Sequence, residues 1–166
     1  MKDDFDDLIR AFRTAPDKLS REVMQKSLTL AEKVAGRARD GAPVNQGRLR
    51  NSIMSYTQAD GDVIEGGART DYAPAIYQEF GTGPVGVESG YPDSNMAIAY
   101  RPDGWVYQSE EVARMRGEEY VPNESGGYVY TRGVPAKAFM YNAITSMEDQ
   151  ILSQLGEAAL EVFAKK

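Results

Sequence analysis

The chain has 166 residues, a length that fits one ordinary domain with its own buried core. It contains no cysteine and no histidine, which excludes disulfides, thiol or Ser-His-Asp nucleophiles, and zinc sites built from Cys and His. The formal net charge of -6 argues against a general nucleic-acid binder, because such proteins bind phosphates mainly through Lys and Arg.

Two helices are predicted at the amino end. Apolar residues at helical spacing predict a short amphipathic helix before a break at Thr14-Ala15-Pro16, with a frayed terminal helix as the alternative; they are Phe5, Leu8, Ile9 and Phe12. Four nearby aspartates, Asp3, Asp4, Asp6 and Asp7, suit the positive end of that helix. A longer helix follows, with Thr14 as its cap and Pro16 in its first turn, and ends near Asp40-Gly41. Its apolar face consists of Leu19, Val23, Leu30, Val34 and Ala38.

After Arg50 the pattern changes to the alternation of a strand. One side carries Ile53, Ser55 and Thr57, and the other carries Met54 and Tyr56. Asp60-Gly61 then predicts a hairpin turn, with a second strand beginning at Val63. Residues 72–80 are expected to form a short helix or turn that carries Ile76 and Phe80 inward and ends at Gly81-Thr82-Gly83-Pro84.

The segment 83–125 is expected to be a loop insertion with little regular structure. Strands are predicted at residues 96–100, 104–108 and 127–132, and a loop or small helix at residues 109–125. A strong helix closes the chain. Its apolar stripe is Met140, Ile144, Met147, Ile151, Leu155, Ala158 and Val162.

This order of elements predicts an α+β fold, in which a small, mostly antiparallel β-sheet is covered by a long N-terminal and a long C-terminal α-helix. We expect one domain spanning residues 1–166. The first residues are acidic where a signal peptide is basic, and no apolar run approaches the ~20 residues of a membrane span. The protein is therefore expected to be made in a cytoplasm, without membrane association.

Three segments resemble motifs of the HK97-like phage tail-completion family, whose members act at the neck in head-tail joining. They are residues 42–53 (APVNQGRLRNSI), residues 72–82 (YAPAIYQEFGT) and residues 131–143 (TRGVPAKAFMYNA). The resemblance is carried by Pro43, Gly47, Leu49, Tyr72, Glu79, Phe80, Gly81, Pro135 and Phe139. Two positions depart from the family pattern: Gln46 stands where Thr is usual, and Ala138 where Pro is usual before the Phe.

The resemblance implies a non-enzymatic structural protein of a tailed bacteriophage or phage-derived particle, without cofactor, metal or small-molecule substrate. Its place is the head-tail junction of the virion, after assembly in the host cytoplasm. A ring of identical subunits is expected, with six copies preferred and twelve as the alternative, in contact with neck and tail proteins. Tail-terminator and head-closure roles in the same region are the nearest alternatives.

Two sets of residues are candidates for contact with partners. Arg37, Arg39, Arg48 and Arg50 flank the turn after the long helix, where they suit an acidic neighbouring subunit or DNA in a central channel. The turn can also be interpreted as a structural connector between a helix and a strand, without a partner. The alternative function for the whole protein is that of a small DNA-binding protein. In the segment 83–125, the candidate anchors are Tyr91, Trp105 and Tyr107. We expect this segment and the first dozen residues to reach other subunits.

Other chemistry finds little support in the sequence. Carboxylates such as Asp71, Glu79, Glu118 and Glu119 show no spacing that predicts an acid-base pair, and solvated surface charge explains them better. The Gly81-Thr82-Gly83 turn lacks the lysine of a phosphate-binding loop. Phe80 is expected to fill the core, and Phe139 to pin the closing helix onto the sheet beside Leu30 and Val34.

Overall fold

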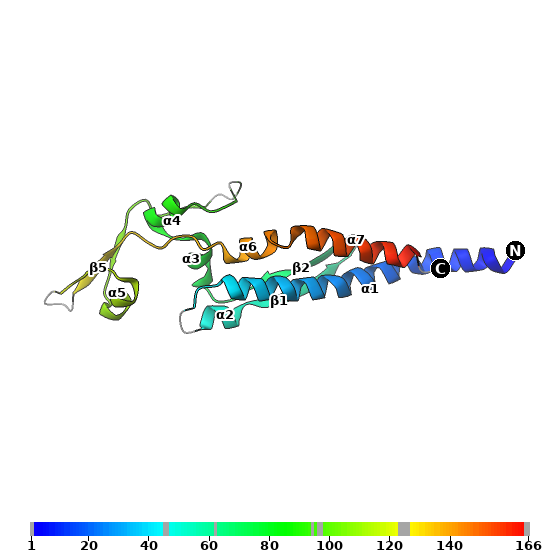
Figure 1. Cartoon of the computed structure of the whole chain (residues 1–166), viewed down its shortest axis with the longest axis horizontal. Helices are drawn as coiled ribbons and strands as arrows, with labels where there is room; N and C mark the ends of the chain where they lie inside the picture. The colour runs from blue at the N-terminus through cyan, green and yellow to red at the C-terminus, as the bar shows by residue number, and fades with distance from the viewer. Residues whose placement is uncertain are drawn as a thin grey trace. The chain divides into compact units, whose positions relative to one another are not determined.

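The computed structural model describes the backbone of residues 2–44, 47–61, 63–93, 95, 98–122 and 127–164, and side chains within residues 19–161 other than Met115 and Arg116. The chain divides into two compact units (Figure 1). Unit 1 contains Met1–Asp71 and Asn142–Lys166, and unit 2 contains Tyr72–Tyr141. The segment 83–125, expected as an insertion, lies within unit 2.

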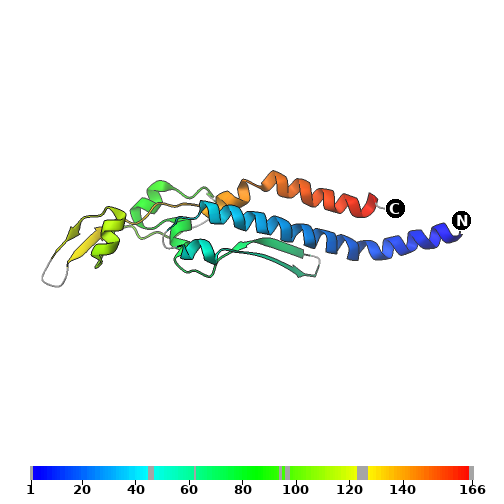
Figure 2. The same ribbon diagram turned by 60° about the horizontal axis from the view of Figure 1, so that its bottom comes forward.

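Unit 1 is built on the long helix α1 (Lys2–Gly41). The antiparallel hairpin of β1 (Met54–Asp60) and β2 (Val63–Arg69) packs on one side of α1, and α7 (Glu148–Ala164) packs on another (Figure 2). The short helix α2 (Arg48–Ser52) leads into β1. The core of unit 1 is apolar and nearly inaccessible to solvent, and includes Leu30, Val34, Ala38, Leu49, Ile53 and Met147.

The expected break between two N-terminal helices is wrong, since α1 continues through Thr14-Ala15-Pro16. Proline removes only one backbone donor, and the turns on both sides of Pro16 continue the helix. The predicted end near Gly41 is confirmed. On the predicted apolar face, Leu30, Val34 and Ala38 are buried, whereas Leu19 and Val23 are half-buried.

The single closing helix expected from the sequence is two helices, α6 (Phe139–Thr145) and α7. Ser146 and Met147 form the turn between them. Met147 and Ala158 are buried as predicted, Met140, Ile151 and Leu155 are half-buried, and Ile144 is exposed. The side chain of Val162 lies outside the described residues. The turn shifts the helical phase, so one stripe cannot face the core along its whole length.

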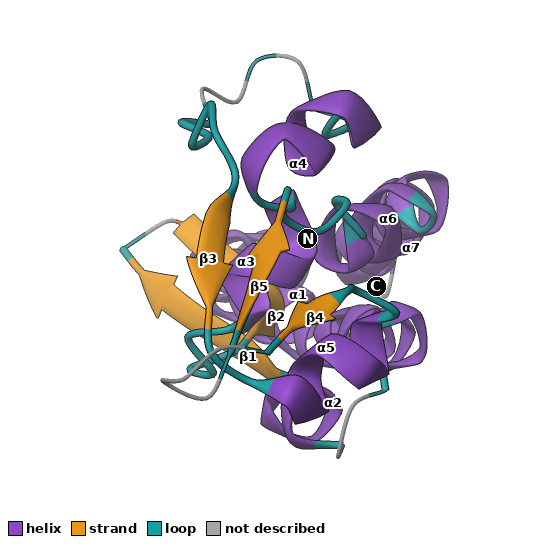
Figure 3. Ribbon diagram, turned by 90° about the vertical axis from the view of Figure 1, so that its left-hand side faces the viewer, coloured by secondary structure: helices purple, strands orange, loops and turns teal. Residues whose placement is uncertain are grey.

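Unit 2 consists of short elements around the three-stranded antiparallel sheet β3-β5-β4 (Figure 3). Its elements are α3 (Ala75–Phe80), α4 (Gly83–Ser89), β3 (Trp105–Tyr107), α5 (Glu110–Arg116), β4 (Tyr120–Val121) and β5 (Tyr128–Thr131). Helix α5 covers one face of this sheet, where Ala113, Val129 and Thr131 are buried.

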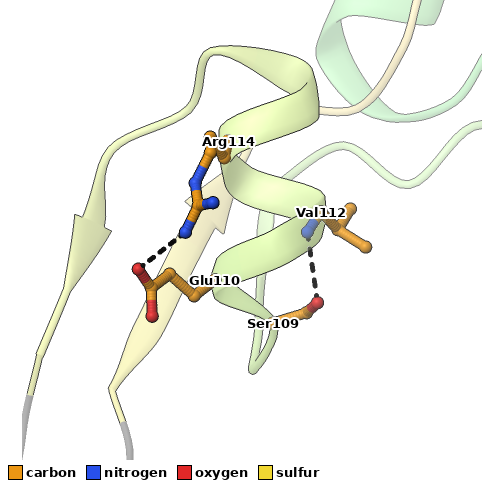
Figure 4. A network of polar contacts seen from close by, with 4 residues as sticks. All are labelled: Ser109, Glu110, Val112 and Arg114. Carbon is orange, nitrogen blue, oxygen red and sulfur yellow. Dashed lines mark hydrogen bonds and ion pairs between the residues drawn. The ribbon is translucent and has the colours of Figure 1, made fainter.

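Helix α5 shows why residues 109–122 are not a plain loop. Ser109 caps the helix, because its side chain accepts a hydrogen bond from the backbone N–H of Val112 at 3.3 Å (Figure 4). Arg114 forms an exposed ion pair with Glu110 one turn away, at 3.1 Å. The small-helix alternative is thus confirmed for this segment, with β4 in addition.

The other predictions for the strands have mixed outcomes. The strands expected at residues 104–108 and 127–132 are confirmed as β3 and β5. In the expected strand at residues 96–100, Ile98–Tyr100 are irregular, and Met96 and Ala97 lie outside the described residues. The α+β class with long terminal helices is confirmed, but the described residues form two small sheets, and α7 packs mainly against α1.

Candidate functional site

Glu79 is a buried carboxylate that caps helix α6. One carboxylate oxygen, Oε2, accepts the backbone N–H of Met140 at 2.8 Å, and the other, Oε1, accepts that of Tyr141 at 3.0 Å. The negative charge therefore lies at the positive end of a helix and has several donors, which offsets the cost of burying it. The Glu of the second family motif thus holds the helix that begins in the third motif.

The burial of Glu79 corrects the prediction for α3. Ile76 was expected to point inward, but it is 56% exposed, and the buried residues of this helix are Ala75 and Glu79. Phe80 is half-buried. The apolar periodicity fails here because the helix turns its carboxylate, rather than its isoleucine, towards the interior of unit 2.

Tyr91 joins the same cluster. Its hydroxyl donates to Glu79 Oε1 at 2.9 Å, and its ring lies 4.8 Å from the ring of Phe80 and 5.6 Å from that of Tyr141, measured between centroids. Burial, followed by the hydrogen bond to Glu79 and its negative charge, raises the pKa of the Tyr91 phenol well above its usual range. The residue expected to anchor a partner is thus already engaged inside unit 2.

The glycine turn after α3 lies against the segment 132–136. Thr82 N–H donates to the Val134 carbonyl at 2.8 Å, and the Val134 N–H donates to Thr82 Oγ1 at 3.1 Å. Gly81 has a φ of +77°, and a Cβ there would lie 2.6 Å from the backbone nitrogen of Ala136. Small residues are therefore required by a close approach of two backbones, which joins the second and third motifs.

Phe139 and Pro135 belong to this third motif. Phe139 begins α6 and is 2% exposed, which confirms its burial, whereas its role in pinning the helix onto the sheet stays a prediction. Ala138 before it has a φ of +48° and donates its N–H to the Glu79 carbonyl at 3.0 Å. Proline, usual here in the family, has neither that φ nor that N–H, so the departure at Ala138 suits the backbone of this chain. Pro135 is exposed.

The four arginines do not form one free patch. Arg37 donates to the carbonyl and hydroxyl oxygens of Ser146, both at 2.9 Å, while Arg39 donates to the Ile53 carbonyl at 2.9 Å. Arg50 donates to the Ala42 carbonyl at 3.5 Å. Arg48 is exposed at the start of α2. Three of the four side chains therefore connect parts of unit 1.

The first motif shapes the connection between α1 and β1. Gly47 precedes α2 with a φ of +71°, and Leu49 is buried. Pro43 is half-buried, and Gln46 lies outside the described residues. The connection between α1 and β1 thus contains a short helix that the sequence analysis did not predict.

Trp105 and Tyr107 lie on β3 and are half-buried. The Tyr107 hydroxyl donates to Glu118, and the other oxygen of Glu118 accepts the hydroxyl of Thr131 at 2.6 Å. Glu118 is accordingly bound to hydroxyl groups of its own unit. In unit 2, Tyr72 at the start is half-buried and is also engaged in a contact within the chain.

One face of the β3-β5-β4 sheet is open and apolar. Val106 lies directly opposite Tyr130, and Val121 opposite Tyr128, so the four side chains share one face. Val106 is 60% and Tyr130 58% exposed. Alternation along the strand expected at residues 127–132 places Tyr128 and Tyr130 on one side, but no sequence pattern indicated that this side would be uncovered.

A groove of about 890 Å³ lies elsewhere on unit 2, and we call it the aromatic groove. Its wall contains four aromatic side chains, Tyr77, Phe80, Tyr100 and Trp105. The Tyr100 hydroxyl donates to the Phe80 carbonyl at 2.8 Å, which fixes one side of the wall. Arg101 also lines the groove, and no Asp, Glu or Lys is among its lining residues.

Within the described part of the chain, no group of three or more Asp or Glu side chains is arranged to hold a metal ion. No helix among the described residues is long and apolar enough to cross a membrane. The exposed surfaces described above in unit 2 are the open face of the β3-β5-β4 sheet and the aromatic groove.

Residues 6–81 match a family described as "Bacteriophage HK97-gp10, putative tail-component". The first motif and residues 72–81 of the second lie within the match, whereas the third motif lies beyond it. No match was found among curated proteins or among solved structures. The family match confirms the resemblance to HK97-like phage tail proteins that the motifs indicated.

Proposed function

Proceeding from the similarity to HK97-like phage tail components, we propose that this protein is a non-enzymatic ring subunit that completes the tail and joins it to the head. The observation that carries the proposal is the family match over residues 6–81. Members of such a family act through assembly, and assembly needs exposed surface that a neighbour can bury.

The open face of the β3-β5-β4 sheet supplies that surface. Large apolar side chains such as Val106 and Tyr130 gain by leaving water, and aromatic residues are enriched at the centres of protein interfaces. A contact of this face with a different surface on the next copy is heterologous, and such contacts close into a ring when the rotation permits. Six copies are proposed, with twelve as the alternative.

The mass of the purified assembly and its appearance by electron microscopy test this proposal. The expected results are a mass of six chains, or twelve, and annular particles. Val106→Lys should weaken the ring by placing a charge on the open sheet face. Val63→Lys is the matched control, because Val63 is 59% exposed on a strand of unit 1. A monomer both in solution and in the assembled particle would overturn the proposal.

We propose that the ring lies at the head-tail junction of the virion, in contact with neck and tail proteins. Tail-terminator and head-closure roles predict other positions in the particle, so labelling the subunit in intact phage separates the three. Loss of the subunit should give separate heads and tails if it joins them. Heads joined normally to tails in its absence would contradict this role.

DNA contact is the weaker candidate. Arg37, Arg39 and Arg50 donate to oxygens of unit 1, which reduces the charge available to phosphates. Salt-dependent binding of DNA by the purified ring, lost in Arg48→Ala, would be evidence for it.

A further inference from the structure

The aromatic groove has the features of a site for a segment of another chain. Its volume of about 890 Å³ falls in the range of about 300–1,000 Å³ that is usual for small-molecule pockets, which is space for the side chains on one face of such a segment. Tyr77 and Ile76, two of its lining residues, are more than half exposed. An occupant that covered these side chains would remove apolar surface from water.

The charge around the groove favours a particular occupant. Arg101 is exposed, and the lining contains no carboxylate to neutralise it. The preferred ligand therefore combines apolar side chains for the aromatic wall with negative charge for Arg101.

The first residues of the chain have this composition. Their sequence places Phe5, Leu8, Ile9 and Phe12 at spacings of i, i+3, i+4 and i+7, which is the pattern of a helix that binds in a groove. Four aspartates lie between residues 3 and 7. The backbone here is already helical, and the first turns of α1 extend past the end of α7 in both views of unit 1 (Figures 1 and 2).

We propose that the N-terminal segment 2–12 of one copy docks as a helix in the aromatic groove of a neighbouring copy, with Asp4 or Asp6, which flank the apolar face of this helix, near Arg101. The inference rests on the proposed ring, because each copy has one segment and one groove. Such a pair is heterologous, and its repetition around an axis leaves every groove filled. The contact would be separate from the open sheet face.

Photo-crosslinking in the full-length assembly tests the occupant directly. A benzoylphenylalanine replaces Tyr77 in the groove, and rings are assembled from a mixture of isotopically light and heavy chains. The expected product links position 77 of one chain to residues 2–12 of another, and appears as mixed light-heavy peptides. The matched control replaces Tyr130, which is equally exposed on the open sheet face, and its products should not include residues 2–12.

Each other outcome overturns the inference in a recognisable way. Links found only within light or only within heavy chains would mean that the segment occupies the groove of its own copy. Links to another part of the chain, or none in an intact ring, would leave the proposed function standing while removing this contact. A protein that never assembles would remove both proposals.

Charge reversal provides a second readout. Arg101→Glu should weaken subunit association at least tenfold and make it less sensitive to salt, since one attractive contact becomes repulsive. Arg114→Glu, an exposed change on α5 outside the groove lining, should leave association unchanged. Equal effects of the two variants would show that net charge, not the groove, controls assembly.

Discussion

The two units are stabilised by different kinds of interaction. Unit 1 buries large apolar side chains from helices α1 and α2 and from two connecting segments, including Leu30, Leu49, Ile53 and Met147. The buried apolar residues described in unit 2 are three alanines, one valine and Phe139, and beside them it buries the polar residues Glu79 and Thr131. Unit 1 therefore depends on apolar area spread over many residues, whereas unit 2 depends on a few individual contacts.

This difference implies a difference in sensitivity. Loss of one apolar contact in unit 1 leaves many neighbours that still exclude water. In unit 2, one lost hydrogen bond leaves a buried polar group without its partner, which costs more than the bond itself contributes. Substitutions that remove single contacts of unit 2 should therefore lower the free energy of unfolding measurably, because the small apolar core of unit 2 does not compensate for them.

The largest effect is expected for Phe139→Ala, which removes the one large buried apolar side chain described in unit 2. The expected cost is about 3–5 kcal/mol of unfolding free energy, measured by denaturant titration. Ile144→Ala on the same helix is the control, and should cost much less because Ile144 is 40% exposed. An unchanged melting temperature together with loss of head-tail joining would show instead that Phe139 faces a partner.

The next largest effect is expected where the backbone at Gly133 lies against the backbone at Thr82. Gly133 has a φ of +101°, and a Cβ there would lie 1.9 Å from the Thr82 carbonyl oxygen. Gly133→Ala should destabilise the protein by about 3 kcal/mol or more, because neither backbone can move without breaking the hydrogen bonds around Thr82.

Gly90→Ala is the control that distinguishes backbone strain from a steric clash of the new Cβ atom. Gly90 also has a positive φ, +68°, but a Cβ there meets nothing within 4 Å. Its substitution should cost less, about 1–3 kcal/mol, because only the strained backbone conformation, with φ +68° and ψ 141°, contributes. Similar losses for the two variants would show that the close approach at Gly133 is relieved elsewhere.

The sequence predicted unit 1 much better than unit 2, for a physical reason. The face of α1 repeats over many residues, and the alternation at residues 53–57 is followed by the Asp60-Gly61 turn of the hairpin, so the signals support one another. The turn at Ser146 and Met147 was missed because residues on both sides of it continue the same apolar spacing. The helix break expected at Pro16 was wrong because one proline does not outweigh helical neighbours.

Unit 2 carries little periodic information. The role of Glu79 depends on where the backbone of Met140 lies, 61 residues later in the chain. A carboxylate of this kind is indistinguishable in sequence from a surface charge. The family resemblance marked Glu79 as part of a motif, but only the hydrogen bonds explain why it is there.

The residues predicted from the sequence to contact partners differ from the apolar residues that are strongly exposed in the structure. Tyr91, Trp105 and Tyr107 were chosen as aromatic residues in an irregular segment, and all three are half-buried in unit 2. The strongly exposed apolar residues, among them Val106, Tyr130 and Tyr77, were not distinguished by sequence, because exposure is decided by which face another element covers.

A smaller effect is expected for Tyr91→Phe, which keeps the ring packing and removes the hydrogen bond to Glu79. The expected loss at neutral pH is about 1–2 kcal/mol, since the acceptor is a carboxylate. Denaturant titration measures it. Tyr56→Phe on the hairpin of unit 1 is the control. An equal loss for both would mean that the Tyr91 hydroxyl contributes nothing specific.

The pH dependence of the same variant gives a second test. The pKa of Tyr91 is raised in the folded protein, so its contribution to stability is complete below the ordinary phenol pKa of about 10 and is lost as pH rises above it. The native protein should therefore lose stability more steeply than Tyr91→Phe above about pH 10. Parallel curves for the two proteins would contradict the burial of this hydroxyl.

The smallest effect tests whether polar contacts matter in unit 1 as they do in unit 2. Arg37 reaches the turn between α6 and α7 and donates to two oxygens of Ser146. Because Arg37 is exposed, water replaces the lost donors in Arg37→Ala, and the expected cost is only about 0.5–1 kcal/mol. Arg48→Ala, an exposed arginine on α2, should change the unfolding free energy by less than about 0.5 kcal/mol. If Arg37→Ala instead cost as much as Tyr91→Phe, the turn between α6 and α7 would depend on a single polar contact, and unit 1 would share the sensitivity of unit 2.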